Sequence, residues 1–296
     1  MIVHLIDGTY ELFRQFFGRP GHLNAAGEEV GAARSVLRDM LYLLEDGATH
    51  LGVATDHVIE SFRNDLYDGY KSGEGLDPLI LGQFQPLEDG LRALGITLFP
   101  MVEFEADDAM GAAAIVAAAD PRVDRVLICT PDKDLAQVVQ EGRIVQFDRR
   151  REKIYDVADV IEKYGVPPES IPDYLGLVGD TADGFPGLKG WGAKSAAAVL
   201  SRYGHIENIP TGAGQWDITV RGGSKLADTL AENLADALLF RRIATLDLDA
   251  PTITDVDELR WTGPTDELPT IAERFDAPDL VTRAAALATS RRGAAS

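Results

Sequence analysis

Acidic residues at the start of a predicted helix are the first candidates for chemistry in this sequence. Glu105, Asp107 and Asp108 stand directly before the alanine-rich run 109–119. Strong helix formers fill this run, so the acids fall at a helix N-terminus, where unpaired backbone N–H groups favour negative charge. Capping therefore explains this motif on its own more readily than metal binding does.

The same arrangement recurs along the first half of the chain. Four apolar runs of strand length, 2–6, 49–55, 95–100 and 124–130, are separated by helical segments, and acids follow each of them. Strands that alternate with helices imply a parallel sheet with right-handed crossovers, and ligands bind where the carboxyl ends of such strands meet. We therefore expect a mostly parallel sheet flanked by helices, with these side chains together at one edge: Asp7, Asp56, Glu105, Asp107, Asp108, Asp132 and Asp134.

Converging carboxylates point to bound cations. Such a group is tolerated only if its pKa values rise or if divalent cations neutralise it, and ligand sets made of oxygen alone suit Mg²⁺ or Mn²⁺ rather than zinc. Each acid taken singly is explained well enough as a loop or cap residue. The set as a whole favours a metal site.

The character of the chain changes after a predicted hairpin at 143–155. Helices are expected at 157–165, 169–178 and 195–203, which gives an α/β domain at 1–165 and a smaller helical domain at 166–296. An amphipathic helix is predicted over 225–243, and a disordered tail over about 288–296. In the first domain, a helix with a break at Pro86 is predicted before the run 95–100.

Two features of the helical domain could take part in binding. Asp180 and Asp183 add two acids, and the glycine-rich segment 186–194 opens a helix. Such hairpins present backbone N–H groups to a phosphate. The alternative is a tight corner between helices in which the glycines serve only packing.

Composition sets limits on these interpretations. The net charge of −20 argues, taken alone, against nucleic-acid binding, which needs Lys and Arg. No run is long enough to cross a membrane, the start of the chain leaves no room for a signal peptide, and the single Cys129 excludes an internal disulfide. We expect a soluble, cytoplasmic protein, and nothing argues against a monomer.

In combination these motifs resemble the 5′–3′ exonuclease and flap endonuclease family, which includes the N-terminal nuclease domain of bacterial DNA polymerase I. The resemblance runs from residue 2 to about 203. It rests on the order of the motifs Leu5-Ile6-Asp7-Gly8, Asp56, Glu105-Ala106-Asp107-Asp108, Thr130-Pro131-Asp132-Lys133-Asp134-Leu135, Gly179-Asp180-Thr181-Ala182-Asp183 and Pro186-Gly187-Leu188-Lys189-Gly190-Trp191-Gly192.

The resemblance implies a stand-alone, structure-specific 5′ nuclease that hydrolyses DNA phosphodiesters with two or more divalent metals, in DNA replication or repair. The implied fold is a PIN/resolvase-like domain followed by a helix-hairpin-helix at about 175–203, with an arch over the site at about 61–85. We assign Asp56, Glu105, Asp107 and Asp132 to one metal, Asp134, Asp180 and Asp183 to a second, and Asp7 and Asp108 to metal-bound waters.

The resemblance also implies roles for other residues. Lys71 and Arg63 match arch positions that contact the scissile phosphate. The helix-hairpin-helix would grip duplex DNA, with a bound K⁺, through Gly187, Lys189, Gly190, Gly192 and Lys194. DNA with 5′ ends or 5′ flaps is the expected substrate, and RNA–DNA hybrids are a further candidate.

The sequence departs from the family at two positions, which leaves alternatives open. Glu74 stands where the family usually has an Arg, and Gly184 where it usually has an Asn. An acidic arch favours a DNA-binding paralogue with weak or no nuclease activity, whereas the complete acid set opposes it. A small-molecule phosphatase, suggested by Asp7-Gly8-Thr9, would need a nucleophilic Asp where Leu5 stands.

Overall fold

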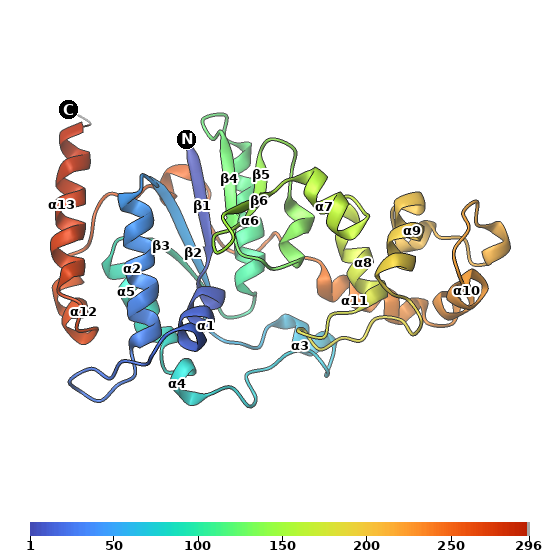
Figure 1. Cartoon of the computed structure of the whole chain (residues 1–296), viewed down its shortest axis with the longest axis horizontal. Helices are drawn as coiled ribbons and strands as arrows, with labels where there is room; N and C mark the ends of the chain where they lie inside the picture. Colours follow the sequence, from blue (N-terminus) through green and yellow to red (C-terminus); the bar gives the residue numbers. More distant parts are fainter. Residues whose placement is uncertain (295–296) are drawn as a thin grey trace. The chain divides into compact units, whose positions relative to one another are not determined.

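The structure is a computed structural model that describes residues 1–294 (Figure 1). The chain forms two compact units. The sheet unit comprises residues 1–59, 73–130 and 248 onwards, and the helical unit comprises residues 60–72 and 131–247. The chain therefore leaves and re-enters the sheet unit twice.

Four parallel strands form the centre of the sheet unit. Their order is β3 (Thr97–Met101), β2 (His50–Asp56), β1 (Ile2–Asp7) and β4 (Arg125–Cys129). The expected mostly parallel sheet is confirmed. Because Asp7 is in register with Ala54, the last residues of β1 and β2 leave the sheet at the same edge.

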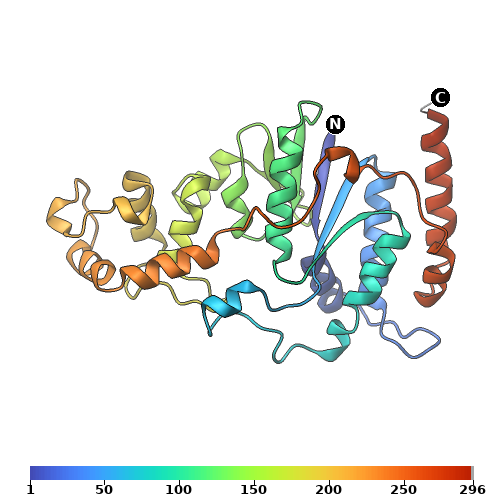
Figure 2. The same cartoon turned by 180° about the vertical axis from the view of Figure 1, so that it is seen from behind.

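Helices cover this sheet because its strands are apolar on both faces, as burial of neighbouring residues such as Leu5 and Ile6 shows. Helix α6 (Ala106–Ala119) packs along all four strands and is seen in front of them in Figure 2. Helices α1 (Gly8–Gly18) and α2 (Gly31–Glu45) lie in front of the strands in Figure 1. The unit is completed by α4 (Pro78–Leu81), α5 (Phe84–Ala93), α12 (Leu268–Arg274) and α13 (Asp279–Ala294).

The helical unit has its own apolar core, which includes Leu177, Phe185, Trp191 and Phe240. Its helices are α3 (Phe62–Leu66), α7 (Val157–Tyr164), α8 (Ile171–Val178), α9 (Ala193–Tyr203), α10 (Gly223–Glu232) and α11 (Leu234–Ala244). A 3₁₀ helix at Asp134–Val138 and an antiparallel pair, β5 (Ile144–Asp148) and β6 (Lys153–Tyr155), precede α7. Helices α8 and α9 flank the predicted hairpin.

Three expectations about elements need correction. The predicted tail is helical to Ala294, because α13 packs against α2 with the Arg38 guanidinium 2.6 Å from the Asp279 carboxylate; residues 295–296 lie outside the described part. The predicted helix 225–243 is two helices, because the backbone at Asn233 leaves the helical conformation. Pro86 breaks no helix, since it lies in the first turn of α5, where no backbone donor is needed.

The boundary between compact units also differs from the predicted domain boundary near 165. Residues 131–164 belong to the helical unit, as do residues 60–72 from the predicted arch, while 248–294 return to the sheet unit. The physical reason is packing: α8 contacts the 3₁₀ helix Asp134–Val138, and α11 contacts α3. No helix among residues 1–294 is both long and apolar enough to span a membrane.

Candidate metal centre and nucleic-acid interface

A tight hairpin after α8 carries two of the predicted metal ligands, Asp180 and Asp183. Asp180 and Phe185 exchange backbone hydrogen bonds of 2.8 and 3.0 Å, and the Asp180 carboxylate accepts a third, of 2.9 Å, from the Ala182 N–H. Gly179 makes the entry to the hairpin possible, because a Cβ at its φ of +85° would stand 2.4 Å from the carbonyl carbon of Pro186. Phe185 is buried and stacks on Phe240, with ring centroids 5.7 Å apart, so the hairpin is anchored in the core.

Asp134 approaches this hairpin from the segment that follows β4. It begins the 3₁₀ helix, and its backbone N–H donates to the Asp132 carboxylate over 3.1 Å. The Asp132 carbonyl in turn accepts from the Gln146 side-chain amide on β5 over 2.5 Å. The antiparallel pair therefore sets the position of the turn that presents Asp134.

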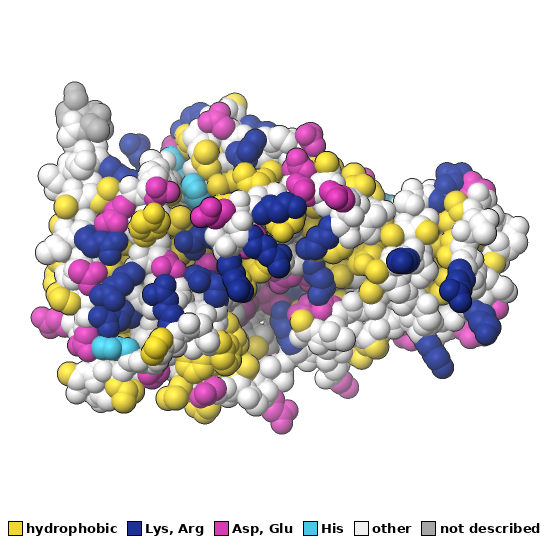
Figure 3. All heavy atoms as spheres, viewed as in Figure 1, with side chains coloured by type: hydrophobic (Ala, Val, Ile, Leu, Met, Phe, Trp, Pro, Cys, Tyr) yellow, Lys and Arg dark blue, Asp and Glu magenta, His cyan; other side chains and the backbone are white. Residues whose placement is uncertain are grey.

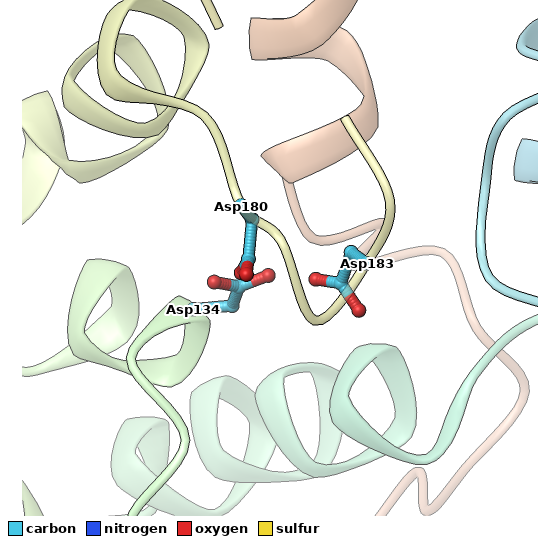
Figure 4. A group of neighbouring side chains, drawn as sticks. All are labelled: Asp134, Asp180 and Asp183. Carbon is cyan, nitrogen blue, oxygen red and sulfur yellow. The ribbon is translucent and has the colours of Figure 1, made fainter. Parts of the chain in front are cut away.

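Asp134, Asp180 and Asp183 form a compact carboxylate triad. Each offers an oxygen within 4.8 Å of those of the other two. Figure 4 shows the carboxylates of Asp134 and Asp180 next to each other, with Asp183 beside them on the same hairpin as Asp180. The exposed fractions of Asp134 and Asp180 are 5% and 4%, and that of the Asp183 side chain is 13%. This is the group that the sequence assigned to the second metal.

The electrostatics of the triad fit a site for a hard cation. Burial raises the pKa of Asp183, and the neighbouring charges of Asp180 and Asp132 raise it further, against an opposing effect of Lys71. A divalent cation held by these oxygens would relieve the cost of burying like charges together. The donor set contains only oxygens, which suits Mg²⁺ or Mn²⁺.

Two lysines face the triad. Lys133 forms an ion pair with Asp180; burial alone would lower the pKa of this ammonium, but the hydrogen bond with Asp180 and the charges of Asp134 and Asp132 outweigh burial and raise it. Lys71 Nζ lies 2.9 Å from Asp183 Oδ1, and the Lys71 N–H donates to the Asp183 carbonyl over 3.0 Å. Lys71, the predicted arch lysine, is therefore next to the predicted metal ligands.

Arg63, the second predicted arch residue, is buried in the helical unit. Its side chain is 1% exposed, and its Nε and Nη2 donate to the carbonyls of Ile243 and Thr245 over 2.7 and 3.1 Å. These carbonyls close the C-terminus of α11, where a cation is favoured by the helix dipole. These hydrogen bonds give Arg63 a structural role, and its contact with a scissile phosphate stays a prediction.

The remaining predicted ligands of the sheet unit gather at the carboxyl edge of its strands. Asp7 accepts from the Tyr10 N–H at the start of α1 (2.7 Å) and from the Thr130 hydroxyl (2.9 Å). Asp56 accepts from the Ala106 N–H (2.8 Å). At the start of α6, Asp108 accepts from the Glu105 N–H (3.0 Å), and Asp107 accepts from the Asp108 N–H (2.7 Å). These side chains thus take part in hydrogen bonds at the starts of α1 and α6.

The glycine-rich hairpin 186–194, between the Asp180–Phe185 hairpin and α9, contains a closely packed glycine and exposed lysines. Gly187 serves close packing, because its Cβ would lie 2.3 Å from the Gly179 nitrogen, whereas a Cβ at Gly192 would meet no atom. Lys189 and Lys194 are exposed, and neither has an ion-pair partner among residues 1–294. Figure 3 shows several Lys and Arg side chains over α9 and α10, at the right of the view. The region 186–204 contains no acid, so its surface differs from the average of this acidic chain.

Sequence reasoning missed three residues around these sites. Lys133 was not singled out, although its place between Asp132 and Asp134 was a signal. The Thr130 hydroxyl donates to Asp7, and the Thr9 hydroxyl accepts from the Asp56 N–H. Both threonines stand in motifs beside predicted ligands, but neither was assigned a role.

Comparison with known proteins agrees with this architecture. A family model described as "5′-3′ exonuclease, N-terminal resolvase-like domain" matches residues 2–165, and one described as "5′-3′ exonuclease, C-terminal SAM fold" matches residues 166–267. DNA polymerase I of Pseudomonas aeruginosa is 34% identical over 265 residues, which cover 86% of this chain but only 28% of that protein. The chain thus spans less than a third of the length of this relative.

Solved structures share the fold at low sequence identity. The T5 5′-exonuclease with bound zinc ions is 18% identical, with a TM-score of 0.64 over 96% of this chain and all of that one. The catalytic core of Rad2 in complex with a DNA substrate is 15% identical, with a TM-score of 0.61 over 96% of this chain and 91% of that one. Two family domains matched in order over residues 2–267 show that the chain belongs to the 5′–3′ exonuclease family.

Proposed function

We propose that this protein is a structure-specific 5′ nuclease that hydrolyses DNA phosphodiesters with the help of divalent cations. The observation that carries the proposal is the triad of Asp134, Asp180 and Asp183, whose oxygens lie within 4.8 Å of one another at largely buried positions. Membership of a 5′–3′ exonuclease family and a buried carboxylate cluster both support metal-dependent hydrolysis of phosphodiesters.

The triad would hold a Mg²⁺ or Mn²⁺ ion. Such a cation lowers the pKa of bound water and stabilises the negative charge of a leaving oxygen. The assignment of Asp7, Asp56, Glu105, Asp107, Asp108 and Asp132 to a further metal and its waters stays a prediction, as does a K⁺ ion at the hairpin.

Other residues of the chain would position the substrate. Lys71 places an ammonium beside the triad, where it can donate to a phosphate oxygen and compensate its charge. Lys189 and Lys194 would contact phosphates of the duplex further from the scissile bond, which adds affinity without sequence preference.

The substrate is proposed from the relatives. DNA with a 5′ end or 5′ flap is the substrate that the family suggests, and the neighbour Rad2 is described in complex with a DNA substrate. Action on RNA–DNA hybrids, a monomeric state and a cytoplasmic location remain predictions from the sequence.

The decisive test is cleavage of an end-labelled 5′-flap duplex at low salt, with Mg²⁺, with Mn²⁺ and with a chelator, beside the same duplex without a flap. We expect metal-dependent cutting near the junction. Binding of the flap duplex without cleavage under any of these conditions would reject the nuclease and favour a DNA-binding paralogue.

A further inference from the structure

Lys71 contacts the hairpin of Asp180 and Asp183 through its backbone N–H and its side chain, and its carbonyl is bonded to α3. Its N–H donates to the Asp183 carbonyl over 3.0 Å, and its carbonyl accepts from the Asn64 side-chain amide over 2.9 Å. The ammonium lies 2.9 Å from Asp183 Oδ1. The position of this ammonium therefore depends on how closely the backbone around Lys71 approaches the hairpin.

Gly184 allows the backbone of residues 69–71 to lie this close to the hairpin. A Cβ at this residue would stand 2.2 Å from the Gly69 carbonyl oxygen and 3.5 Å from the Lys71 nitrogen. The first distance is far too short for any real contact, and the obstructing atom belongs to the backbone, so it cannot turn away as a flexible side chain can. The absence of a side chain at Gly184 is thus a condition for the observed contact between the two backbones.

A side chain at this position would displace the segment of Lys71 rather than the hairpin. The hairpin is fixed by its two backbone hydrogen bonds between Asp180 and Phe185 and by the fully buried ring of Phe185. The segment 67–71 has no strand or helix hydrogen-bond ladder of its own. Its side-chain anchors are Tyr67, which packs edge-on against Phe240 with centroids 5.5 Å apart, and Tyr70, which is 6% exposed in the core of the helical unit. A shift of this segment that keeps both rings in place still moves the backbone at Gly69 and Lys71.

We propose that Gly184 is a positioning residue that sets the Lys71 ammonium beside the carboxylate triad. The inference rests on the proposed function, because it assigns Gly184 a role through Lys71 in DNA cleavage.

The test compares Gly184→Ala with Gly204→Ala. Both glycines have positive φ, of +85° and +76°, but a Cβ at Gly204 would meet no atom within 4 Å. Both variants therefore place a Cβ on a backbone of positive φ, and only Gly184→Ala adds the clash. We expect Gly184→Ala to lower the single-turnover rate on the 5′-flap duplex by about tenfold or more, with DNA affinity changed by less than about threefold. Gly204→Ala should leave both within about twofold of the wild-type protein.

A double-mutant cycle with Lys71→Ala identifies the route of the effect. If Gly184 acts through Lys71, Gly184→Ala should slow the Lys71→Ala protein no further. The inference would be overturned if Gly184→Ala slowed the Lys71→Ala protein by the same factor as the wild-type protein. It would also be overturned if Gly184→Ala and Gly204→Ala had equal rates. Should Gly184→Ala fail to fold, Gly184→Asn replaces it, since Asn accepts positive φ more readily and brings the same Cβ.

Failure of the inference can be told apart from failure of the proposed function. A wild-type protein that does not cleave the flap duplex rejects the function. A wild-type protein that cleaves, together with a Lys71→Ala variant of unchanged rate, keeps the nuclease and rejects the role of Lys71 and with it that of Gly184.

Discussion

Asp180 is a buried member of the triad that lies beside charges of both signs. It is 4% exposed, lies beside Asp134 and Asp183, and is paired with Lys133. Asp180→Asn keeps the shape of the side chain and removes one anionic ligand. We expect cleavage to fall by on the order of a hundredfold or more, because a hard cation loses a charged oxygen.

The same variant should retain its fold. Removing one of several buried like charges offsets the loss of the pair with Lys133, so thermal unfolding in the presence of chelator should change little. The exposed Asp228→Asn on α10 is the matched control. Full activity of Asp180→Asn would contradict the assignment of the triad.

Lys71 should affect the rate of cleavage much more than the affinity for DNA. Its ammonium is next to Asp183, so its proposed contact is with the reacting phosphate and not with the length of the duplex. We expect Lys71→Ala to reduce the single-turnover rate by about ten- to a hundredfold and to change the dissociation constant by less than about threefold. Lys225→Ala is the control, because it removes the same charge from an exposed position on α10, away from the triad. A parallel loss of affinity and rate in Lys71→Ala would instead assign this lysine to binding.

For single residues, the sequence predicted which side chains lie near the site better than it predicted how buried they are. The resemblance implied the grouping of Asp134 with Asp180 and Asp183, and the three carboxylates are close together in the structure. The burial of Arg63 could not be predicted, because the carbonyls that accept its hydrogen bonds stand 180 and 182 positions away in sequence.

Among the elements, the C-terminus of α11 depends on a single buried cation. Arg63 donates to the carbonyls of Ile243 and Thr245, and Gln137 donates to that of Ala244 over 3.0 Å. Arg63→Met keeps much of the apolar stem but leaves buried carbonyls without donors. We expect the free energy of unfolding to fall by about 2–4 kcal/mol, measured by urea denaturation. A loss of activity without any loss of stability would restore a direct role of Arg63 in the reaction.

Helix α13 illustrates why the end of the chain was mispredicted. Its sequence carries small residues and charges without a clear apolar stripe, so no periodic pattern indicates a surface on which it packs. The structure docks it on α2 through Arg38 with Asp279 and through Arg283 with Glu45, at 2.6 and 2.7 Å. These pairs join residues about as far apart in sequence as the chain allows, which local reasoning cannot detect.

The docking of α13 should weaken in acid. The hydrogen bond from Arg38 lowers the pKa of Asp279, and that from Arg283 lowers the pKa of Glu45. A carboxyl group with a depressed pKa contributes stability that is present above its unfolded pKa, about 4, and is lost as the pH falls through its folded pKa. We expect amide hydrogen exchange in α13 to accelerate as the pH is lowered below about 4, after correction for intrinsic exchange, and Asp279→Asn to reduce this acid dependence. Identical pH profiles for Asp279→Asn and the wild-type protein would contradict this account.

For the whole molecule, the arrangement of charge matters more than its total. Composition gave a net charge of −20 and argued against nucleic-acid binding, yet many of the acids lie in sites and ion pairs, and the region 186–204 has none. The alternation of strands and helices predicted the parallel sheet, because period and order are local properties of a sequence. The division into two compact units was not predictable in the same way, since it depends on segments that leave one unit and return to it.

A local basic surface on an acidic protein has a measurable consequence in the salt dependence of DNA binding. Lys189 and Lys194 are exposed and make no ion pair within the described residues, so each can displace a counterion from a DNA phosphate. For duplex DNA the logarithm of the binding constant falls with the logarithm of salt concentration by about 0.9 for each neutralised phosphate, so Lys189→Ala with Lys194→Ala should reduce the slope by about 2. Lys163→Ala, an exposed lysine of α7 outside the hairpin, should leave the slope unchanged.

The same titration separates a local from a global effect of charge. If only the net charge mattered, Lys163→Ala would weaken binding at each salt concentration as much as Lys189→Ala does, because both variants make the protein more acidic by one charge. If the hairpin 186–194 binds the DNA, Lys189→Ala lowers the slope and Lys163→Ala does not. An equal response of the two single variants would therefore reject the hairpin between α8 and α9 as the DNA-binding surface, whatever the outcome of the cleavage assay.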